Sequence, residues 1–172
     1  MMVAHFDSRF RQTKLQKTVY SYGAGDDAYG VGSILELLSQ ALKYRDEWHQ
    51  GVRILLTDSE ENALDGMKCA AKYNPELFEN VGYVVNLESR GMNGPVLLFE
   101  TSANNENVLD LYSEAKAPYG YSLTTVVYRF LPNNTDFTIV KDSIPGINFS
   151  TIDNINYYHV DDDNFENINL AT

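Results

Sequence analysis

Short apolar runs alternate with amphipathic segments along the whole chain. Residues Met1–His5 and Val52–Thr57 are apolar runs bounded by polar or turn residues, a pattern typical of buried strands. Between these runs, apolar residues recur at i, i+3, i+4 and i+7 from Val31 until the pattern fades near Asp46, which predicts an amphipathic helix. The polar stretch Ser8–Ser21 is interpreted as a loop. The first third of the chain therefore predicts a strand, a loop, a helix and a second strand.

The same alternation continues to the end of the chain. Further strands are predicted at Tyr83–Leu87, Val96–Phe99, Leu123–Tyr128 and Gly146–Ser150, where apolar, β-branched and aromatic residues gather. Further helices are predicted at Ala63–Tyr73 and Asn107–Ala115, and another is predicted to start near Asn133–Asp136. Strands that alternate with helices indicate a layered α/β domain whose central sheet is mostly parallel.

Composition then limits the class of protein. The chain has 172 residues, the size of one domain, and 44% of them are hydrophobic, which is enough for a core. The formal charge of −11 argues against nucleic acid as a partner, because a phosphate backbone is bound by clustered positive charge. The single cysteine, Cys69, excludes an internal disulfide and is expected to be buried in the second helix. No apolar run approaches the roughly 20 residues that a membrane helix needs, so this segment is expected to be soluble.

Both ends of the sequence are abrupt. The chain begins directly with an apolar strand, and it ends at Asn167–Thr172 without an obvious closing element. No charged region followed by an apolar stretch and a small-residue cleavage site precedes the first strand, so the start is not a signal peptide. We therefore expect residues 1–172 to be a segment of a longer protein rather than a naturally short chain.

Acidic side chains and two of the three histidines follow the predicted strands or precede the first helix. They are His5, Asp7, Asp26, Asp27, Asp58, Glu60, Glu61, Glu88 and His159. Taken singly, each is better explained by chance placement of a surface residue. In parallel α/β sheets, however, functional groups gather beyond the carboxyl ends of the strands. We therefore expect this set to converge at one edge of the sheet.

The residue types in this set are those of a metal site without thiolates. Imidazole and carboxylate groups are common zinc ligands, and a divalent cation relieves the repulsion among clustered carboxylates. In the pair Glu60–Glu61, one side chain at a strand-to-helix turn can bind metal while its neighbour acts as general base toward a water that the metal acidifies. The alternative is that these glutamates only stabilise the start of the next helix.

Five motifs in the chain resemble those of the M28 zinc aminopeptidases, in the order of that family. They are Ala4–Ser8, Gly23–Gly30, Thr57–Glu61, Asn86–Glu88 and Tyr157–His159. The resemblance implies a three-layer α/β/α fold with a mixed, mostly parallel sheet and a two-zinc site that removes N-terminal residues from peptides. Four further segments are similar to one bacterial branch, in which the peptidase domain is often attached to membrane-spanning segments. They are Asn86–Gly91, Gly94–Pro95, Phe99–Ser102 and Pro132–Phe137.

The resemblance also implies a set of zinc ligands. His5 and Glu88 would hold one ion, and Glu61 and His159 would hold the other. Asp26 would bridge the two ions.

Five other residues receive roles from the resemblance. Glu60 would be the general base, and the hydroxyl of Tyr158 would stabilise the oxyanion. Asp7 and Asp163 would fix the orientation of ligand residues without binding the metal themselves. Asp136 would lie near the amino group of the substrate.

The sequence departs from the family pattern at both ends. Members usually carry a substantial region before the first histidine motif and a closing helix after the last one, and both are missing here. The domain in residues 1–172 is therefore expected to be incomplete. A strand edge, or a surface that the missing helix would cover, is then a candidate interface for a homodimer. The parent protein is expected to be extracytoplasmic or membrane-associated.

Two other functions remain open at this point. A glutaminyl-cyclase-like acyltransferase shares the fold but works with one zinc, and its relatives lack the first metal histidine, so His5 with Asp7 favours the peptidase. A catalytically inert binding domain of the same fold is the other alternative. The complete set of ligand types together with Glu60 argues against it.

Overall fold

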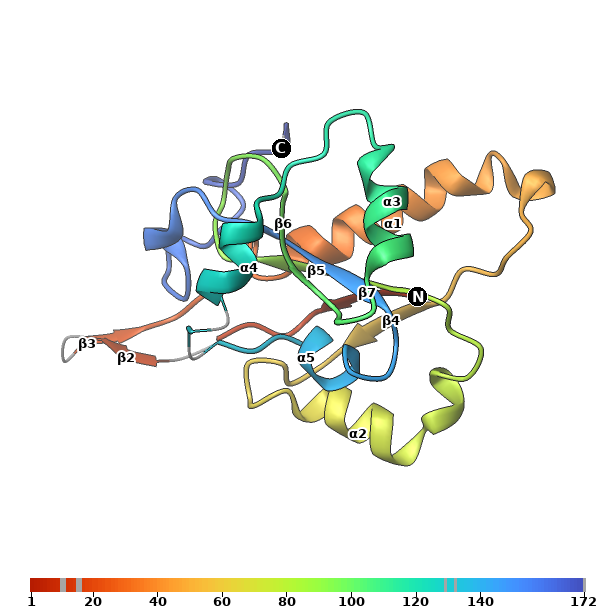
Figure 1. Ribbon diagram of the computed structural model, residues 1–172. Helices are drawn as coiled ribbons and strands as arrows, with labels where there is room; N and C mark the ends of the chain where they lie inside the picture. The colour runs from red at the N-terminus through yellow and green to blue at the C-terminus, as the bar shows by residue number, and fades with distance from the viewer. Residues whose placement is uncertain (10–11, 15–16, 129, 132, 172) are drawn as a thin grey trace.

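A five-stranded sheet forms the centre of the computed structural model, which describes residues 1–9, 12–14, 17–128, 130–131 and 133–171 (Figure 1). The strands, in their order across the sheet, are β4 (Ile54–Thr57), β1 (Met2–His5), β5 (Val84–Ser89), β7 (Gly146–Thr151) and β6 (Leu97–Thr101). The first four are parallel, and β6 runs antiparallel to β7. The expected mixed, mostly parallel sheet is confirmed. Pro132, the first residue of one sequence motif, lies outside the described residues.

Helices cover both faces of this sheet. On one face lie α1 (Ala28–Leu42) and α3 (Glu106–Ser113), and on the other lie α2 (Asp65–Tyr73) and α5 (Phe137–Val140) (Figure 1). Successive strand residues point to opposite faces, so Val84 packs with Met67 of α2 and Phe137 of α5, whereas Val85 packs with Val108 of α3. The three-layer α/β/α architecture is therefore confirmed. Short 3₁₀ turns follow the helices at Arg45–Glu47 and Pro75–Leu77, and a third lies at Ile155–Tyr157.

The register of the parallel strands brings their carboxyl ends to one edge. His5 at the end of β1 pairs with Thr57 at the end of β4, and Glu88 of β5 pairs with Ser150 of β7. The chain passes from β1 to β4 on one side and then crosses back to β5 on the other side of β1. Such a reversal of strand order opens a crevice at the carboxyl ends, and in open α/β sheets this crevice is where ligands bind.

The first helix begins three residues earlier than its apolar pattern indicates. Asp27 is its N-cap, and the Asp27 Oδ1 atom accepts a hydrogen bond of 3.1 Å from the backbone N–H of Gly30. This cap starts α1 directly after Asp26. The helix therefore holds the Asp26 loop against the edge of the sheet.

The predicted strand at Leu123–Tyr128 is wrong, because Ser122–Tyr128 forms a helix, α4. Its Thr and Val residues suit strands, but that propensity is weak and packing overrides it. The backbone at the edge of β6 is already paired, since Leu98 bridges to Gly120. The helical turn places the Tyr128 ring edge-on to Phe99, with centroids 4.7 Å apart.

Two smaller expectations also fail. The stretch interpreted as a loop contains an antiparallel hairpin of β2 (Gln12–Lys14) and β3 (Lys17–Val19), which extends away from the central sheet in Figure 1. Residues 10–11 and 15–16 of that stretch lie outside the description. Cys69 lies in α2 but is exposed, because it falls on the face of the helix opposite the buried Met67.

Candidate metal centre

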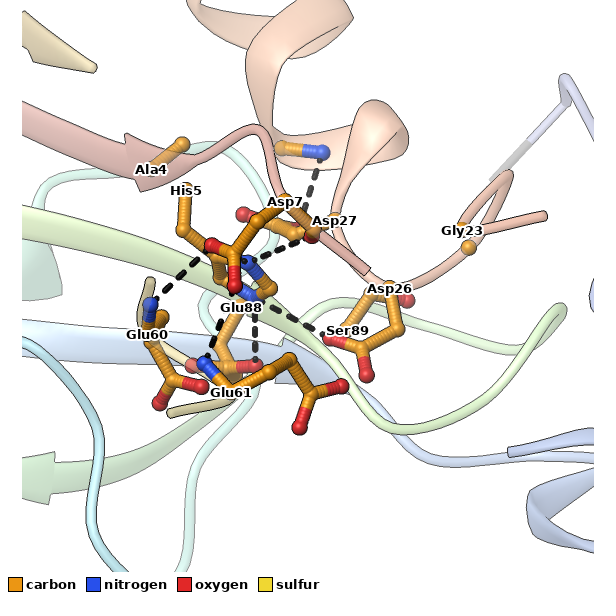
Figure 2. Close-up of polar contacts among 12 residues, drawn as sticks. Ala4, His5, Asp7, Gly23, Asp26, Asp27, Glu60, Glu61, Glu88 and Ser89 are labelled. Atoms are coloured by element: carbon orange, nitrogen blue, oxygen red, sulfur yellow. Dashed lines mark hydrogen bonds and ion pairs between the residues drawn. The ribbon is translucent and has the colours of Figure 1, made fainter. Parts of the chain in front are cut away.

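Two groups of side chains that could hold metal ions meet at the carboxyl edge of the sheet. The first group is His5, Asp26 and Glu88, and the second is Asp26, Glu61 and His159. Within each group the ligand atoms lie within 4.8 Å of one another. Figure 2 shows the side chains of His5, Asp26, Glu61 and Glu88 converging from separate segments of the chain. All five residues predicted as metal ligands are therefore brought together.

The first group is built on adjacent strands. His5 ends β1, Glu88 lies near the end of β5, and Asp26 comes from the turn before α1. The Nε2 atom of His5 lies 3.1 Å from Asp26 Oδ1 and 3.6 Å from Glu88 Oε1. Burial lowers the pKa of His5, but the contacts with Asp26, Asp7 and Glu88 outweigh it and raise the pKa above its ordinary value.

The second group uses the other oxygen of Asp26. The His159 Nε2 atom lies 3.0 Å from Asp26 Oδ2 and 2.6 Å from Glu61 Oε1. His159 has a left-handed backbone with φ of 61°, and its ring stacks on Tyr158 with centroids 3.6 Å apart. Because each carboxylate oxygen of Asp26 faces a different group, Asp26 has the geometry of a bridging ligand.

Two buried carboxylate oxygens of this centre lack a hydrogen bond, and His5 Nε2 faces two carboxylates. The Nδ1 atom of His5 donates to the backbone oxygen of Asp7 at 3.0 Å, so Nε2 is the ring atom turned to Asp26 Oδ1 and Glu88 Oε1. A protonated ring donates from Nε2 to Asp26, and a neutral ring would present a lone pair there to a metal ion. Asp26 Oδ2 and Glu61 Oε1 are buried and accept no hydrogen bond of suitable geometry from the described residues. Lone pairs that face one another repel unless a cation lies between them, so the residues present fit divalent metal ions.

The two glutamates lie in the turn between β4 and α2. Both backbone N–H groups are held by Asp7, whose carboxylate accepts from Glu60 at 3.0 Å and from Glu61 at 3.2 Å (Figure 2). The N-cap of α2 is Leu64, which makes no side-chain cap, so the two glutamates do not cap that helix. Burial and the neighbouring Glu88 carboxylate raise the pKa of Glu60 to about 9.

A basic residue contacts one of the ligands directly. The Nη2 and Nε atoms of Arg9 lie 2.8 and 3.0 Å from Glu61 Oε2, the oxygen turned away from His159. Arg9 leaves Glu61 Oε1 facing the centre. No sequence signal distinguished Arg9 from the other basic residues of its segment.

Two further predicted residues form hydrogen bonds with segments at the carboxyl edge of the sheet but belong to neither ligand group. Asp163 Oδ1 accepts from the Gly25 N–H at 2.6 Å, and its Oδ2 accepts from the Ser21 hydroxyl at 3.0 Å and from the Asp26 N–H at 3.4 Å. Asp163 therefore holds the loop that carries Asp26. Asp136 precedes α5 and accepts a hydrogen bond from the Thr57 hydroxyl, and burial raises the pKa of Asp136 to about 6.

The remaining acids of the predicted set lie outside both metal groups. Asp27 is the cap of α1, and Asp58 is exposed and accepts from the Ser59 N–H at 2.8 Å. Sequence reasoning missed Arg90 and Tyr128, which lie beside the centre. Arg90 follows the end of β5, so the rule that functional groups gather beyond the carboxyl ends of strands could have found it, as it found Glu88. Tyr128 was missed because its segment was wrongly predicted as a strand.

Comparison with known proteins places this geometry in a family. The profile of peptidase family M28 matches residues 1–172. The chain belongs to peptidase family M28. Its sequence is similar to endoplasmic reticulum metallopeptidase 1 of Homo sapiens, with 31% identity over 169 residues that cover 95% of this chain and 18% of that protein. It is also similar to a vacuolar membrane protease of Paracoccidioides lutzii, with 28% identity over 97% of this chain and 16% of that protein.

A solved structure shows the same fold. LapA of Legionella pneumophila superposes with a TM-score of 0.64 at 19% sequence identity, over 99% of this M28 chain and 47% of LapA. The chain thus spans less than a fifth of the two sequence relatives and about half of LapA. Among the described residues, no helix combines the length and the apolar character needed to cross a membrane.

Proposed function

We propose that this M28 chain is the peptidase domain of a zinc aminopeptidase that removes N-terminal residues from peptides. The observation that carries the proposal is the position of Asp26, whose two carboxylate oxygens face two separate ligand groups. His5 and Glu88 would complete one zinc site, and Glu61 and His159 would complete the other, since imidazole and carboxylate are common zinc ligands. Bound there, the two ions would acidify a water and polarise the carbonyl of the scissile bond.

Glu60 is the residue that moves the proton. It comes from the same turn as Glu61, and the Asp7 carboxylate holds its backbone N–H. It is not a member of either ligand group. Burial and the Glu88 charge raise the pKa of Glu60, and cations bound at the two groups would offset that charge and leave Glu60 ionised. Glu60 would then take a proton from the attacking water and deliver it to the nitrogen of the leaving peptide.

Tyr158 would stabilise the negative charge that develops on the carbonyl oxygen of the substrate. Its ring stacks on His159, and burial together with the Asp26 carboxylate raises the pKa of the Tyr158 hydroxyl. The hydroxyl therefore stays protonated at neutral pH and can donate a hydrogen bond to the carbonyl oxygen as charge builds on it. Asp136, whose Oδ1 is buried and without a hydrogen bond among the described residues, would accept from the amino group of the substrate.

We further propose that residues 1–172 are part of a longer, membrane-attached polypeptide. The support is the small share of each relative that the chain covers, together with the name of the fungal relative, a vacuolar membrane protease. The substrate would then be a peptide that reaches the carboxyl edge of the sheet outside the bilayer.

Metal analysis of the purified protein tests the two-zinc site. Elemental analysis is expected to find close to two zinc ions per chain, and anomalous scattering at the zinc edge is expected to place both around Asp26. His5→Ala should reduce the zinc content to one or fewer, because it removes a ligand of one ion. One zinc per chain in the unaltered protein, with the same content in the His5→Ala variant, would instead support the single-zinc acyltransferase.

Matched substrates test the aminopeptidase specificity. Leucyl-anilide should be hydrolysed, whereas N-acetyl-leucyl-anilide should not, because acetylation removes the positive charge that Asp136 would bind. Equal hydrolysis of both substrates would show that the enzyme does not require a free N-terminus, and the aminopeptidase assignment would be wrong.

A further inference from the structure

Two buried hydrogen-bond donors beside the metal centre have no hydrogen-bond partner among the described residues. They are the Nε atom of Arg90 and the hydroxyl of Tyr128. Buried polar groups are normally paired, so an unpaired donor marks a place where a ligand group is expected. The two donors come from distant parts of the sequence, and neither has a part in the metal site or the proposed chemistry.

The position of Arg90 is well defined. It directly follows β5, and its backbone N–H donates to the backbone oxygen of Thr151 at 3.0 Å and contacts the Ser150 hydroxyl at 3.2 Å. The guanidinium carbon lies 5.7 Å from the ring centroid of Tyr158, which also stacks on the ring of His159. The positive charge of Arg90 is therefore held next to the second metal group.

Tyr128 approaches the same region from β6. It ends α4, packs with Leu97 and Phe99 of β6, and lies edge-on to the Phe99 ring. Leu97 pairs with Ser150, whose hydroxyl accepts the backbone N–H of Arg90, so Tyr128 and Arg90 lie at the same end of the sheet. Burial raises the pKa of the Tyr128 hydroxyl. Because its pKa stays high, the hydroxyl remains a donor at neutral pH.

Arg90 also lacks a dedicated counter-charge. Within the described part of the chain its guanidinium makes no ion pair, and the acids that act on it from a distance are Glu88 and Asp26. Both acids belong to the metal groups. Once their charge is committed to cations, Arg90 is left beside the Tyr158 ring without a compensating negative charge among the described residues.

A guanidinium fork matches the geometry of a carboxylate, and a phenol hydroxyl can supply a further hydrogen bond. We propose that Arg90 and Tyr128 form a carboxylate-binding subsite, so that the substrate of this centre is a peptide with a carboxylate close to the scissile bond. This inference rests on the proposed peptidase function. The carboxylate has two chemical sources, which are the side chain of an N-terminal Asp or Glu and the C-terminal α-carboxylate of a dipeptide.

Pairs of substrates that differ only in this charge separate the two sources. In the zinc-loaded protein, kcat/KM is compared for glutamyl-anilide against glutaminyl-anilide, and for leucyl-leucine against its C-terminal amide. At least a tenfold preference for the charged member is expected in one pair, and that pair identifies the source. Arg90→Gln should abolish the preference, and Tyr128→Phe should weaken it several-fold. Arg45→Gln, which removes an exposed arginine far from the edge, should leave it intact.

Binding provides a second measurement that needs no turnover. Calorimetric titration of the zinc-loaded Glu60→Gln variant with glutamic acid α-amide and glutamine amide, or with the dipeptide and its amide, should show the same preference. If Arg90→Gln fails to fold, Arg90→Lys, which keeps the charge but loses the fork, should reduce the preference at least threefold.

No preference in either pair, or a preference that survives Arg90→Gln, overturns the subsite and leaves Arg90 as a packing partner of Tyr158. Absence of all hydrolysis would contradict the proposed function, and the titrations would still decide the subsite.

Discussion

Two buried polar clusters of this protein differ in how their polar groups are satisfied. One is the candidate metal centre at the carboxyl edge of the sheet. The other, the polar ladder, joins Asn86, Glu100 and Asn148 of the sheet to Thr135 and Lys141, which flank α5. In the ladder, Asn86 donates to Asn148 at 2.9 Å, and Asn148 donates to Thr135 at 2.8 Å and to Glu100 at 3.2 Å. Lys141 donates to the other oxygen of Glu100 at 2.6 Å.

The difference lies in the source of positive charge. The ladder contains its own cation, Lys141, and only the Oδ1 atom of Asn86 lacks a hydrogen bond among its described side chains. The metal centre gathers more acids than bases and leaves oxygens of Asp26 and Glu61 without hydrogen bonds. A buried polar network that is satisfied internally stabilises a fold, whereas one that is short of positive charge is completed by a ligand. The predictions below test this distinction.

The largest effect is expected from Glu60→Gln. The amide cannot accept a proton, so kcat for leucyl-anilide should fall by about a thousandfold or more. The zinc content should not change, because Glu60 belongs to neither ligand group. Activity and metal are measured on the same sample, and a loss of zinc together with activity would show that Glu60 is a ligand rather than the base.

Metal removal should affect the centre and spare the ladder. With zinc at about a thousand times its dissociation constant, binding adds about 4 kcal/mol to the free energy of unfolding. Chelation should therefore lower the melting temperature, and added zinc should restore it. A melting temperature that is insensitive to chelator would mean that the acids of the centre are satisfied without cations.

The opposite outcome is expected for Asn148→Ala in the ladder. The substitution removes the hydrogen-bond partner of Asn86 Nδ2, of Thr135 Oγ1 and of the Oε2 atom of Glu100, which should lower the free energy of unfolding by about 2–3 kcal/mol. Urea denaturation measures this loss. Zinc content should remain as in the unaltered protein, and a variant that loses zinc while keeping its stability would show that the ladder serves the metal centre.

Asp136→Asn tests whether the stability of the metal-free protein depends on pH at the edge of the sheet, where Asp136 accepts a hydrogen bond from Thr57. Because the folded pKa of Asp136 is raised to about 6, its contribution to stability is present below pH 4 and is lost as the pH rises through 6. The variant should therefore be more stable than the unaltered protein by about 3 kcal/mol at pH 8, with no advantage at pH 4. Urea denaturation in chelator at both pH values checks this, and an advantage that does not change with pH would contradict it.

The smallest effect is expected from Asp163→Asn. Weaker support of the Asp26 loop should lower zinc affinity by about tenfold, the typical cost of losing a residue that orients a ligand. Competition with a chromogenic chelator measures it. Asp161→Asn, at an exposed position two residues away, is the matched control and should bind zinc as before.

Much of the site could be predicted from the sequence because it depends on local order. His5 and Glu88 lie at the ends of strands and Glu61 lies in the turn after β4, and in a parallel sheet those ends share one edge. The motif order was specific enough to indicate family M28. The support given by Asp7 and Asp163 followed from that resemblance, and the hydrogen bonds of both residues agree with it.

The tertiary structure alone decided the rest. Leu123–Tyr128 carries strand-forming residues, but packing on β6 makes it a helix, and only that helix brings Tyr128 to the side of the centre near Arg90. The split of Asp26 between two groups likewise depends on distances across segments far apart in the chain. Sequence periodicity reports which face of an element is buried, and the identity of the neighbour on that face is set by the way the layers pack.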